Sequence, residues 1–415
     1  MPTNMKPTLT PTLAQIKLHR YFGGGEIYAR LLCEAVASAG GSTLLITHPE
    51  AQHWREFSLP NTERIEAVTL TQALEKLPAS VPLLTHSALP EAVAKKVASE
   101  RPLIGIVHMP FGTYFAEAAA AYRHYRHVVP VSAYIAATLV EAGLIPYKEP
   151  LLGCADFDRF NATNDPSENC EIGMNNIVRR SEFEWDRRKV RDRFLGWGEP
   201  VWSKLPYLRP HCSYQPKPGL TLGIVSRIAP IKQFDRLFEI IAPIIAQRPN
   251  VNLEIFGAGG YASIRDLRHA LKPIATNTRF WGYQLDVAAI YKHMDVLIAG
   301  LPEKEALGLN VIEAQACGTP VAAVNAPPFV ETILNEQTGF LYVDPRQDGG
   351  KDFATLLDRL IEQKRNQQLP NPALAIEHLT HFSKPAFFAR VGRLMDSVVT
   401  PRPVIDSRVI DGPNN

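Results

Sequence analysis

The sequence lacks the features that mark several large classes of protein. It has only five cysteines among 415 residues, and no two of them form a C-x-x-C pair. We therefore expect neither a disulfide framework nor a cysteine zinc site. The 44 basic and 42 acidic residues nearly cancel, which leaves a formal net charge of +2. This balance gives no electrostatic case for a nucleic-acid partner, because nucleic-acid-binding proteins concentrate Lys and Arg on one face.

Long apolar segments are also missing. No stretch of about 20 residues is free of charges and turn signals, so no transmembrane helix is expected. Residues 1–8 show no basic segment followed by an apolar run, so no signal peptide is expected. An apolar content of 46% and a charged content of 21% are typical of a soluble globular protein. Together these features predict a cytoplasmic protein.

The chain is long enough for two domains, and both halves alternate short apolar runs with helical patterns. This alternation predicts an α/β protein with parallel sheets. Expected strands are 44–47, 82–85, 102–107, 127–130, 220–225, 251–256, 295–299 and 320–324. Expected helices are 28–36, 133–142 and 234–245, the last interrupted by Pro243. The predicted divisions are a first domain over 1–160, a connection over 161–218, a second domain over 219–381, a final helix over 382–399 and a loose tail over 400–415.

Part of the connection, residues 179–193, mixes basic residues with aromatics. One interpretation is an acceptor-binding or membrane-surface element. The other is a solvated helix whose acidic residues pair with its own cations. Because Glu182, Glu184 and Asp186 interleave the cations, we favour the solvated helix. Peripheral contact with the inner membrane face stays open as the alternative.

The most informative segment is 305–320, where Glu305 and Glu313 lie eight positions apart and a Gly-Thr-Pro turn follows. On helical geometry, Glu313 would lie about 80° round from Glu305 and about 12 Å farther along. The backbone amides that would open the helix and form an anion site belong to Ala306, Leu307, Gly308 and Leu309. A phosphate there, between two carboxylates, describes a pocket for a nucleotide sugar. The alternative is an ordinary capped helix that leads through a turn into a buried strand.

Two cations, Arg227 and Lys232, follow the expected strand 220–225. Open α/β folds bind ligands at the edge where parallel strands end. Arg could hold a diphosphate by bidentate donation and Lys as a point charge. On spacing alone, two surface cations before a helix is the better interpretation. Glycine-containing turns follow at 256–260 and 280–283, and glycine lets backbone approach a ligand closely.

These motifs resemble those of glycosyltransferase family 4. Residues 305–321 resemble the signature E-x-F-G-x-x-x-x-E-A-x-A-x-G-x-P-V, with Leu307 where Phe is commonest. Residues 226–233 resemble the element G-R-L-x-x-x-K-G, with Ser226 and Gln233 in place of its glycines. Neither change removes a charge.

The first half resembles the same family in two places. Residues 21–26, which include Gly24 and Gly25, resemble the G-G-x-E loop that faces the donor phosphates and the acceptor. His108, after the expected strand 102–107, matches the family histidine that contacts the donor sugar. His86 follows another strand and is a further candidate for the same place.

The resemblance covers most of the chain and is strongest over residues 220–344. It implies the GT-B fold: two Rossmann-like domains with parallel sheets facing a cleft, and a final helix that crosses back to the first domain. It also implies a retaining, metal-independent glycosyltransferase that uses a nucleotide-diphosphate sugar as donor. The acceptor could be a carbohydrate, a lipid or another small molecule.

The resemblance also implies roles for individual residues. The catalytic group would be His108, Arg227, Lys232 and Glu305. The donor would be bound by Gly24, Gly25, Arg227, Lys232, Gly257, Trp281, Gly282, Tyr283, Glu305, Ala306, Leu307, Gly308, Leu309 and Glu313. Glu313 would accept from the ribose hydroxyls, and Glu305 would hold the donor sugar. Backbone groups of residues 281–283 would lie against the nucleobase.

Other signals are set aside. Asp156 and Asp158 spell the metal-holding D-x-D motif, but their surroundings resemble the turn that closes the first domain in family 4. The histidines lack carboxylate or cysteine partners at metal-ligand spacing, so no metal or other cofactor is predicted. Two rivals to a transferase stay open. One is a nucleotide-sugar epimerase or hydrolase on the same fold, and the other is a non-catalytic module that binds a nucleotide or a protein partner.

Overall fold

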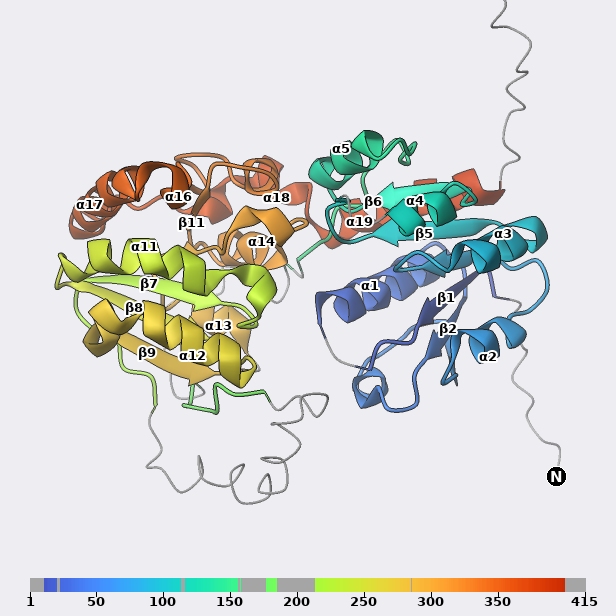
Figure 1. The fold of residues 1–415 in the computed structure, drawn as a ribbon, viewed down its shortest axis with the longest axis horizontal. Helices are drawn as coiled ribbons and strands as arrows, with labels where there is room; N and C mark the ends of the chain where they lie inside the picture. The colour runs from blue at the N-terminus through green and yellow to red at the C-terminus, as the bar shows by residue number, and fades with distance from the viewer. Residues whose placement is uncertain are drawn as a thin grey trace, which may run out of the picture.

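The computed structural model describes residues 11–20, 23–112, 116–155, 157, 177–184, 213–284 and 286–399. They form two α/β domains that lie side by side (Figure 1). Each domain contains a six-stranded sheet, and every strand pair in both sheets is parallel. The prediction of an α/β protein with two parallel sheets is confirmed.

The first sheet has the strand order β3-β2-β1-β4-β5-β6. Its strands are β1 (Leu13–Lys17), β2 (Thr43–Thr47), β3 (Thr62–Glu66), β4 (Leu83–Thr85), β5 (Leu103–Val107) and β6 (His127–Pro130). The helices of this domain are α1 (Gly24–Ser38), α2 (Leu70–Glu75), α3 (Glu91–Glu100), α4 (Ala116–Tyr122) and α5 (Ala133–Glu141). β5 is buried at every position, as expected for a parallel strand covered on both faces.

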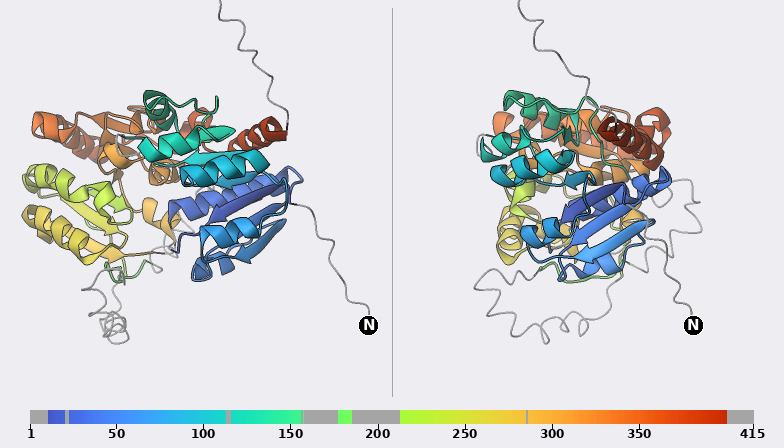
Figure 2. Two further views of the ribbon diagram at one scale, coloured as in Figure 1. Left: turned by 45° about the vertical axis from the view of Figure 1, so that its right-hand side comes forward. Right: turned by 90° about the vertical axis from the view of Figure 1, so that its right-hand side faces the viewer.

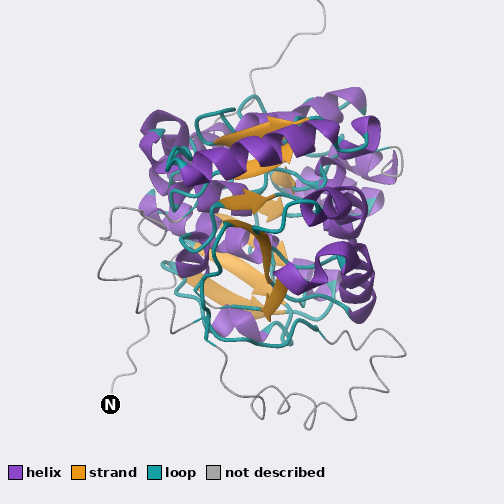
Figure 3. Ribbon diagram, turned by 90° about the vertical axis from the view of Figure 1, so that its left-hand side faces the viewer, coloured by secondary structure: helices purple, strands orange, loops and turns teal. Residues whose placement is uncertain are grey.

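The second sheet has the order β12-β11-β10-β7-β8-β9. Its strands are β7 (Leu220–Val225), β8 (Val251–Phe256), β9 (Thr278–Gly282), β10 (Val296–Ile298), β11 (Val321–Val324) and β12 (Gly339–Tyr342). The helices are α11 (Phe234–Ala246), α12 (Tyr261–Ala270), α13 (Val287–Tyr291), α14 (Leu309–Ala316), α15 (Phe329–Thr332), α16 (Pro345–Asp348), α17 (Lys351–Arg365) and α18 (Ile376–Thr380). Figure 3 shows helices on both sides of these strands.

Strands that are buried along their whole length were the easiest to predict. β7 and β8 have the predicted limits, and both are buried at every position. β3 was missed because it is an edge strand with the sequence TERIE, and none of its residues is fully buried. β1, β9 and β12 were also missed. β1 matters most here, because it is a central strand of the first sheet.

α11 continues through Pro243, where the sequence predicted a kink or a loss of stability. Proline inside a helix costs about 3 kcal/mol, because it removes a hydrogen bond and crowds the preceding turn. The buried face of α11 offsets this cost. It consists of Phe234, Leu237, Phe238, Ile241, Ala242 and Ile245. Each large side chain among them contributes roughly 1.5–3 kcal/mol on burial.

The end of the chain returns to the first domain. α19 (Lys384–Val399) packs along α1, and Figure 1 shows it among the elements of the first domain. Phe387, Val391 and Leu394 are buried in the same core as the strands of the first sheet. The ring of Phe387 meets that of Tyr28 edge-on at 5.4 Å. The core of the first domain therefore contains residues from both halves of the chain.

The domains meet at the carboxyl ends of their strands (Figure 2). Glu331 of α15 accepts hydrogen bonds from the amides of Ala133 (2.8 Å) and Tyr134 (2.6 Å), at the start of the helix that follows β6. Ala306, in the loop after β10, packs against the core of the first domain. Because both contacts lie just beyond strand ends, the ligand-binding edges of the two sheets face each other.

Residues 177–184, which with 213–218 are the described parts of the connection, are not a helix. Val178 forms a bridge with Ser213, and Phe183 forms one with Gly259. Glu182 pairs with Arg268 of α12 at 2.6 Å, not with a cation of its own segment. The preference for a solvated helix is therefore wrong for these residues, because their backbone groups bond to the second domain instead. Residues 185–193 and the D-x-D motif lie outside the described residues.

Candidate functional site

The predicted cations lie on the loop that leaves β7 at its carboxyl end. Lys232 Nζ contacts Glu305 Oε2 in an ion pair between residues 73 positions apart in the sequence. The amide of Leu301 donates to the Lys232 carbonyl at 3.3 Å, which ties this loop to the one after β10. Arg227 is exposed, and its guanidinium makes no hydrogen bond or ion pair with any other described residue. The structure thus leaves one cation free and holds the other against a carboxylate.

Gln233, one of the two departures from the family element, has a left-handed backbone conformation with φ of 52°. Glycine takes this conformation without strain, which accounts for a glycine at the matching place in the resembled element. Here the side chain is anchored on both sides. Its Nε2 donates to Glu303 at 3.1 Å, and its Oε1 accepts from Arg236 at 3.3 Å. The loop therefore keeps its turn without a glycine.

The helix that carries Glu313 starts later than predicted. α14 begins at Leu309, after Gly308 with φ of 81°, and Glu305 before it is extended with φ of −91° and ψ of 141°. The predicted angle of about 80° and separation of about 12 Å assumed a helix from Glu305 onward, so this geometry is wrong. A left-handed glycine turns the chain between the two carboxylates. Glu305 consequently leaves the helix axis and reaches Lys232.

The amides at the start of α14 are available to an anion. The Gly308 carbonyl accepts from Val311 at 2.9 Å and from Ile312 at 3.4 Å, as it should at a helix start. Among the described residues, nothing accepts from the amides of Leu307, Gly308, Leu309 and Asn310. Asn310 Nδ2 donates to the Val225 carbonyl at 3.2 Å, so the helix start lies beside the end of β7. Unsatisfied amides at a helix N-terminus form an anion site.

Glu313 lies on α14 beyond these amides and is held from one side. Tyr291 of α13 donates its hydroxyl to Glu313 Oε2 at 2.9 Å. Burial and the nearby carboxylate raise the pKa of Tyr291 well above its usual range, so the hydroxyl stays protonated and donates. The hydrogen bond fixes the orientation of the carboxylate before any ligand binds.

Gly257 and Gly282 lie where two backbone segments pack too closely to leave room for a side chain. Gly257 has φ of 140°, and a Cβ on it would come within 1.8 Å of the Ser226 carbonyl oxygen. Gly282 has φ of 69°, and a Cβ there would lie 2.4 Å from the carbonyl oxygen of Ser181. The Gly257 amide also donates to the Gly282 carbonyl at 2.8 Å. These glycines therefore bring the loops after β7, β8 and β9 together.

The residues expected at the nucleobase differ in their solvent exposure and in how many of their backbone groups are already hydrogen-bonded. Trp281 is 2% exposed, and its indole donates to Glu254 at 2.6 Å. Its carbonyl already accepts from the Arg180 amide at 2.9 Å and from Gln284 Nε2 at 2.8 Å. Tyr283 is 50% exposed, and its backbone makes no hydrogen bond with another described residue. Of residues 281–283, Tyr283 is thus the one whose groups a ligand can reach.

On the facing domain, Gly24 and Gly25 begin α1, the helix that follows β1 along the chain. Gly24 is exposed, whereas a Cβ on Gly25 would come within 2.7 Å of Lys17 Nζ. Lys17 is only 13% exposed and lies 3.3 Å from Glu26, which is 4% exposed. This largely buried ion pair is absent from the predicted site residues, because β1 was not among the predicted strands.

His86 and His108 stand together at the ends of β4 and β5. His86 Nδ1 lies 3.0 Å from His108 Nε2, and the two rings stack with centroids 5.3 Å apart. Tyr28 packs edge-on against His108 at 4.9 Å. Burial and the charge of Lys17 lower the pKa of His108 to about 3 and hold the pKa of His86 well below its usual range. Both imidazoles are therefore neutral at pH 7.

The predicted residues thus form two groups on facing domains. The second domain pairs Lys232 with Glu305, has Arg227 just after β7 and places the start of α14, which carries Glu313, beside the end of β7; the first has Gly24 and Gly25 at the start of α1 and His108 at the end of β5. Within the described part of the chain, no group of three metal-ligating side chains stands together. In that same part, no helix is both long enough and apolar enough to cross a bilayer.

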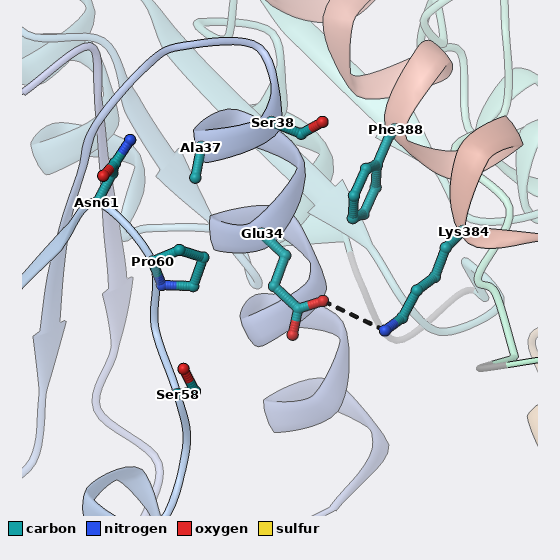
Figure 4. Close-up of a pocket in the computed structure, with 8 residues that line it drawn as sticks. All are labelled: Glu34, Ala37, Ser38, Ser58, Pro60, Asn61, Lys384 and Phe388. Atoms are coloured by element: carbon teal, nitrogen blue, oxygen red, sulfur yellow. Dashed lines mark ion pairs between the residues drawn. The ribbon is translucent and has the colours of Figure 1, made fainter. Parts of the chain in front are cut away.

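A surface hollow of about 520 Å³ lies beside α1 and α19 (Figure 4). It is lined by Glu34, Ala37, Ser38, Ser58, Pro60, Asn61, Lys384 and Phe388. Ala37 and Ser38 end α1, at the opposite end of this helix from Gly24 and Gly25. None of the predicted site residues lines the hollow.

Comparison with known proteins finds a family model that matches part of the chain, within the second domain. Residues 219–363 match the family model described as "Glycosyl transferases group 1". This part of the chain is related to the group 1 glycosyl transferases. The matched residues contain both cations, both carboxylates and the start of α14.

Curated relatives match about a third of the chain. A D-inositol 3-phosphate glycosyltransferase of Rhodococcus jostii (strain RHA1) is 33% identical over 149 residues, which are 34% of this chain and 32% of the relative. A GDP-mannose-dependent monoacylated alpha-(1-6)-phosphatidylinositol monomannoside mannosyltransferase of Corynebacterium glutamicum is 35% identical over 145 residues, 33% of this chain and 36% of the relative. The chain therefore matches these relatives over about a third of their length.

Solved structures are similar over nearly the whole chain. The Anabaena protein HepE, in complex with UDP and glucose, has a TM-score of 0.65 at 15% identity and covers 93% of this chain and 99% of its own. Sucrose-phosphate synthase from Thermosynechococcus elongatus has a TM-score of 0.68 at 18% identity and covers 93% of this chain and 98% of its own. The predicted fold is confirmed: the protein has the GT-B fold, with two Rossmann-like domains.

Proposed function

We propose that the protein is a retaining, metal-independent glycosyltransferase of the family 4 type, which moves a sugar from a nucleotide-diphosphate sugar to an acceptor. The arrangement at the start of α14 carries this proposal. Free backbone amides lie there, with the Lys232–Glu305 pair on the adjoining loops and Arg227 at the end of the neighbouring strand. A diphosphate requires cations and amides of this kind, and sugar hydroxyls require carboxylate acceptors.

In the proposed reaction the bond between the sugar and the diphosphate breaks, and negative charge grows on the leaving oxygen. Arg227, Lys232 and the amides of α14 would stabilise that charge, because they are in place before the bond breaks. One such donor is typically worth about 2.7–4 kcal/mol in the transition state. These groups would supply the positive charge that a metal ion could otherwise provide, so we propose that no metal is needed.

The carboxylates and His108 would hold the remainder of the donor. Glu313, already oriented by Tyr291, would accept from the ribose hydroxyls. Glu305 would accept from the sugar hydroxyls once the diphosphate attracts Lys232. Gly24, Gly25 and His108 would contact the donor from the facing domain. Each role requires a donor that spans both domains at the ends of their strands.

Names of similar proteins suggest which substrates to screen first. HepE has been crystallised with UDP-glucose, and the Corynebacterium relative is named as GDP-mannose-dependent. The relatives' names give D-inositol 3-phosphate and a phosphatidylinositol monomannoside as acceptors. We therefore propose UDP- or GDP-sugars as donors and phosphorylated or lipid-linked polyols as acceptors. We place the enzyme in the cytoplasm, with peripheral contact at the inner membrane face when the acceptor is a lipid.

Thermal unfolding of the purified protein with UDP, GDP, ADP and CMP tests the donor site. A ligand at about a hundred times its dissociation constant stabilises the folded state by roughly 2.7 kcal/mol. We expect one diphosphate to raise the melting temperature of the wild type and not that of Glu313→Ala. The matching sugar nucleotides are then screened for turnover with and without acceptors.

Three outcomes would contradict the proposal. If no nucleotide stabilises the wild type, the site does not bind a nucleotide-sugar donor. If a donor is consumed equally fast without any acceptor, the protein is a hydrolase or an epimerase on the same fold. Binding without turnover of any sugar would instead point to a non-catalytic module.

A further inference from the structure

A chain of polar side chains runs through the first domain behind His108. His108 Nε2 lies 3.0 Å from His86 Nδ1, and His86 Nε2 lies 3.2 Å from Gln15 Oε1. Gln15 is a fully buried residue of β1, and its Nε2 donates to Cys33 Sγ of α1 at 3.3 Å. The proposed function assigns a role only to His108. The roles of His86, Gln15 and Cys33, which are linked to it by hydrogen bonds, need an explanation.

The direction of the hydrogen bonds determines where the protons lie. The Gln15 amide nitrogen points at Cys33, so the atom facing His86 is the carbonyl oxygen, which can only accept. His86 must therefore carry its proton on Nε2. A neutral imidazole has a proton on only one of its two nitrogens. His86 Nδ1 therefore carries a lone pair and accepts a hydrogen bond from His108 Nε2. His108 Nδ1 is then unprotonated.

Packing holds both rings in this arrangement. The two imidazole planes are 13° apart, and Tyr28 lies edge-on to both, at 4.9 Å from His108 and 6.5 Å from His86. The Tyr28 hydroxyl donates to the Leu151 carbonyl at 2.5 Å, which fixes the ring that supports them. Burial and Lys17 keep the pKa of each histidine below its usual range, so neither ring takes a second proton at neutral pH.

We propose that His86 is a positioning residue which, oriented by Gln15, holds His108 in the tautomer whose Nδ1 accepts hydrogen bonds. Among the described residues nothing donates to His108 Nδ1, so this atom is available to a ligand. The group it recognises is a hydroxyl that donates. Resting on the proposed function, this hydroxyl belongs to the donor sugar, and His108 binds it without giving up a proton.

The tautomers can be measured in the ligand-free protein. Long-range proton–nitrogen NMR spectra of protein labelled with ¹⁵N in its histidine rings distinguish a protonated nitrogen from an unprotonated one. We expect both His86 and His108 to carry a proton on Nε2 only, with signals assigned from His86→Asn and His108→Asn. Gln15→Leu removes the acceptor and should give His108 a mixture of tautomers. A wild-type His108 protonated on Nδ1, or on both nitrogens, would overturn the proposal.

Turnover of UDP-glucose or GDP-mannose, whichever is the substrate, gives a second readout. His86→Phe keeps a flat ring but accepts nothing, so kcat/KM should fall about two- to tenfold, the worth of one oriented hydrogen bond. His86→Asn places an amide oxygen near the position of Nδ1 and should restore most of the loss. Equal losses in the two variants would mean that His86 only fills space. The NMR result does not depend on turnover, so a protein that transfers no sugar refutes the proposed function and leaves the tautomer test intact.

Discussion

Replacing Arg227 by alanine separates catalysis from folding better than any other change at the site. The Arg227 side chain is exposed and its guanidinium makes no hydrogen bond or ion pair with another described residue, so its loss removes no such interaction among the described residues. Surface changes of this kind alter the free energy of unfolding by less than about 0.5 kcal/mol. In the transition state, however, Arg227 would face the growing charge of the diphosphate. Losing one such donor typically costs about 2.7–4 kcal/mol, or roughly a hundredfold to a thousandfold in rate.

Lys232→Ala offers an informative contrast, because Lys232 has a partner in the free protein. The side chains of Lys232 and Glu305 are 27% and 16% exposed, and the change leaves a mostly buried carboxylate without its cation. We expect a loss of about 1–3 kcal/mol in the free energy of unfolding, in addition to lost turnover. The two cations should thus share a catalytic effect and differ in their effect on stability.

The assay is steady-state turnover beside urea unfolding for both variants. Arg265→Ala is a matched control, because Arg265 is 60% exposed on α12 and pairs only with its neighbour Asp266 among the described residues. This control should leave turnover and stability unchanged. Near-normal turnover of Arg227→Ala would refute the diphosphate clamp. A large loss of stability in that variant would refute the claim that Arg227 is free.

Three further predictions concern other parts of the molecule. The pKa values of His86 and His108 lie below their unfolded value near 6.5, so their contribution to stability is complete above pH 6.5 and is lost as the pH falls below it, for His108 down to about pH 3. Urea unfolding should show a slope of up to about 1.4 kcal/mol per pH unit for each histidine, and a smaller one in His108→Asn. Gly282→Ala places a Cβ 2.4 Å from the Ser181 carbonyl oxygen at a positive φ, so hydrogen exchange of residues 180–184 should rise while that of the first domain is unchanged. Glu331→Ala removes two charge-assisted bonds between the domains, so small-angle scattering should show a larger radius of gyration; an unchanged radius would mean that other contacts hold the domains together.

The second domain was the more predictable from sequence, for local reasons. β7 (LTLGIV) and β8 (VNLEIF) are rich in apolar residues and buried at every position, because helices cover them on both faces. A helix near the start of α14 could also be predicted, because a turn glycine before an amphipathic helix is a local pattern. The helix limit was nevertheless misplaced, because the φ of 81° at Gly308 cannot be deduced from the letter alone. Glycine adopts positive and negative φ with equal ease.

The sequence patterns of the first domain predicted its strands less clearly, and most of its site residues could not be identified from them. β1 carries a buried glutamine and ends in a partly buried lysine, so its sequence does not resemble that of a central strand. Lys17 was overlooked for this reason. His86 and His108 each looked like a lone histidine after a strand. Only the pairing of β4 with β5 puts them 3.0 Å apart.

The sequence by itself determined the alternation of strands and helices, the two parallel sheets and the kinds of side chain at the strand ends, because periodicity and turn residues act over short distances. Tertiary structure decided which of those side chains meet. The ion pair of Lys232 with Glu305 joins residues 73 positions apart, and the bonds from Ala133 and Tyr134 to Glu331 join residues nearly 200 positions apart. Such contacts depend on strand order and on how the two domains pack, and no local pattern encodes either of these.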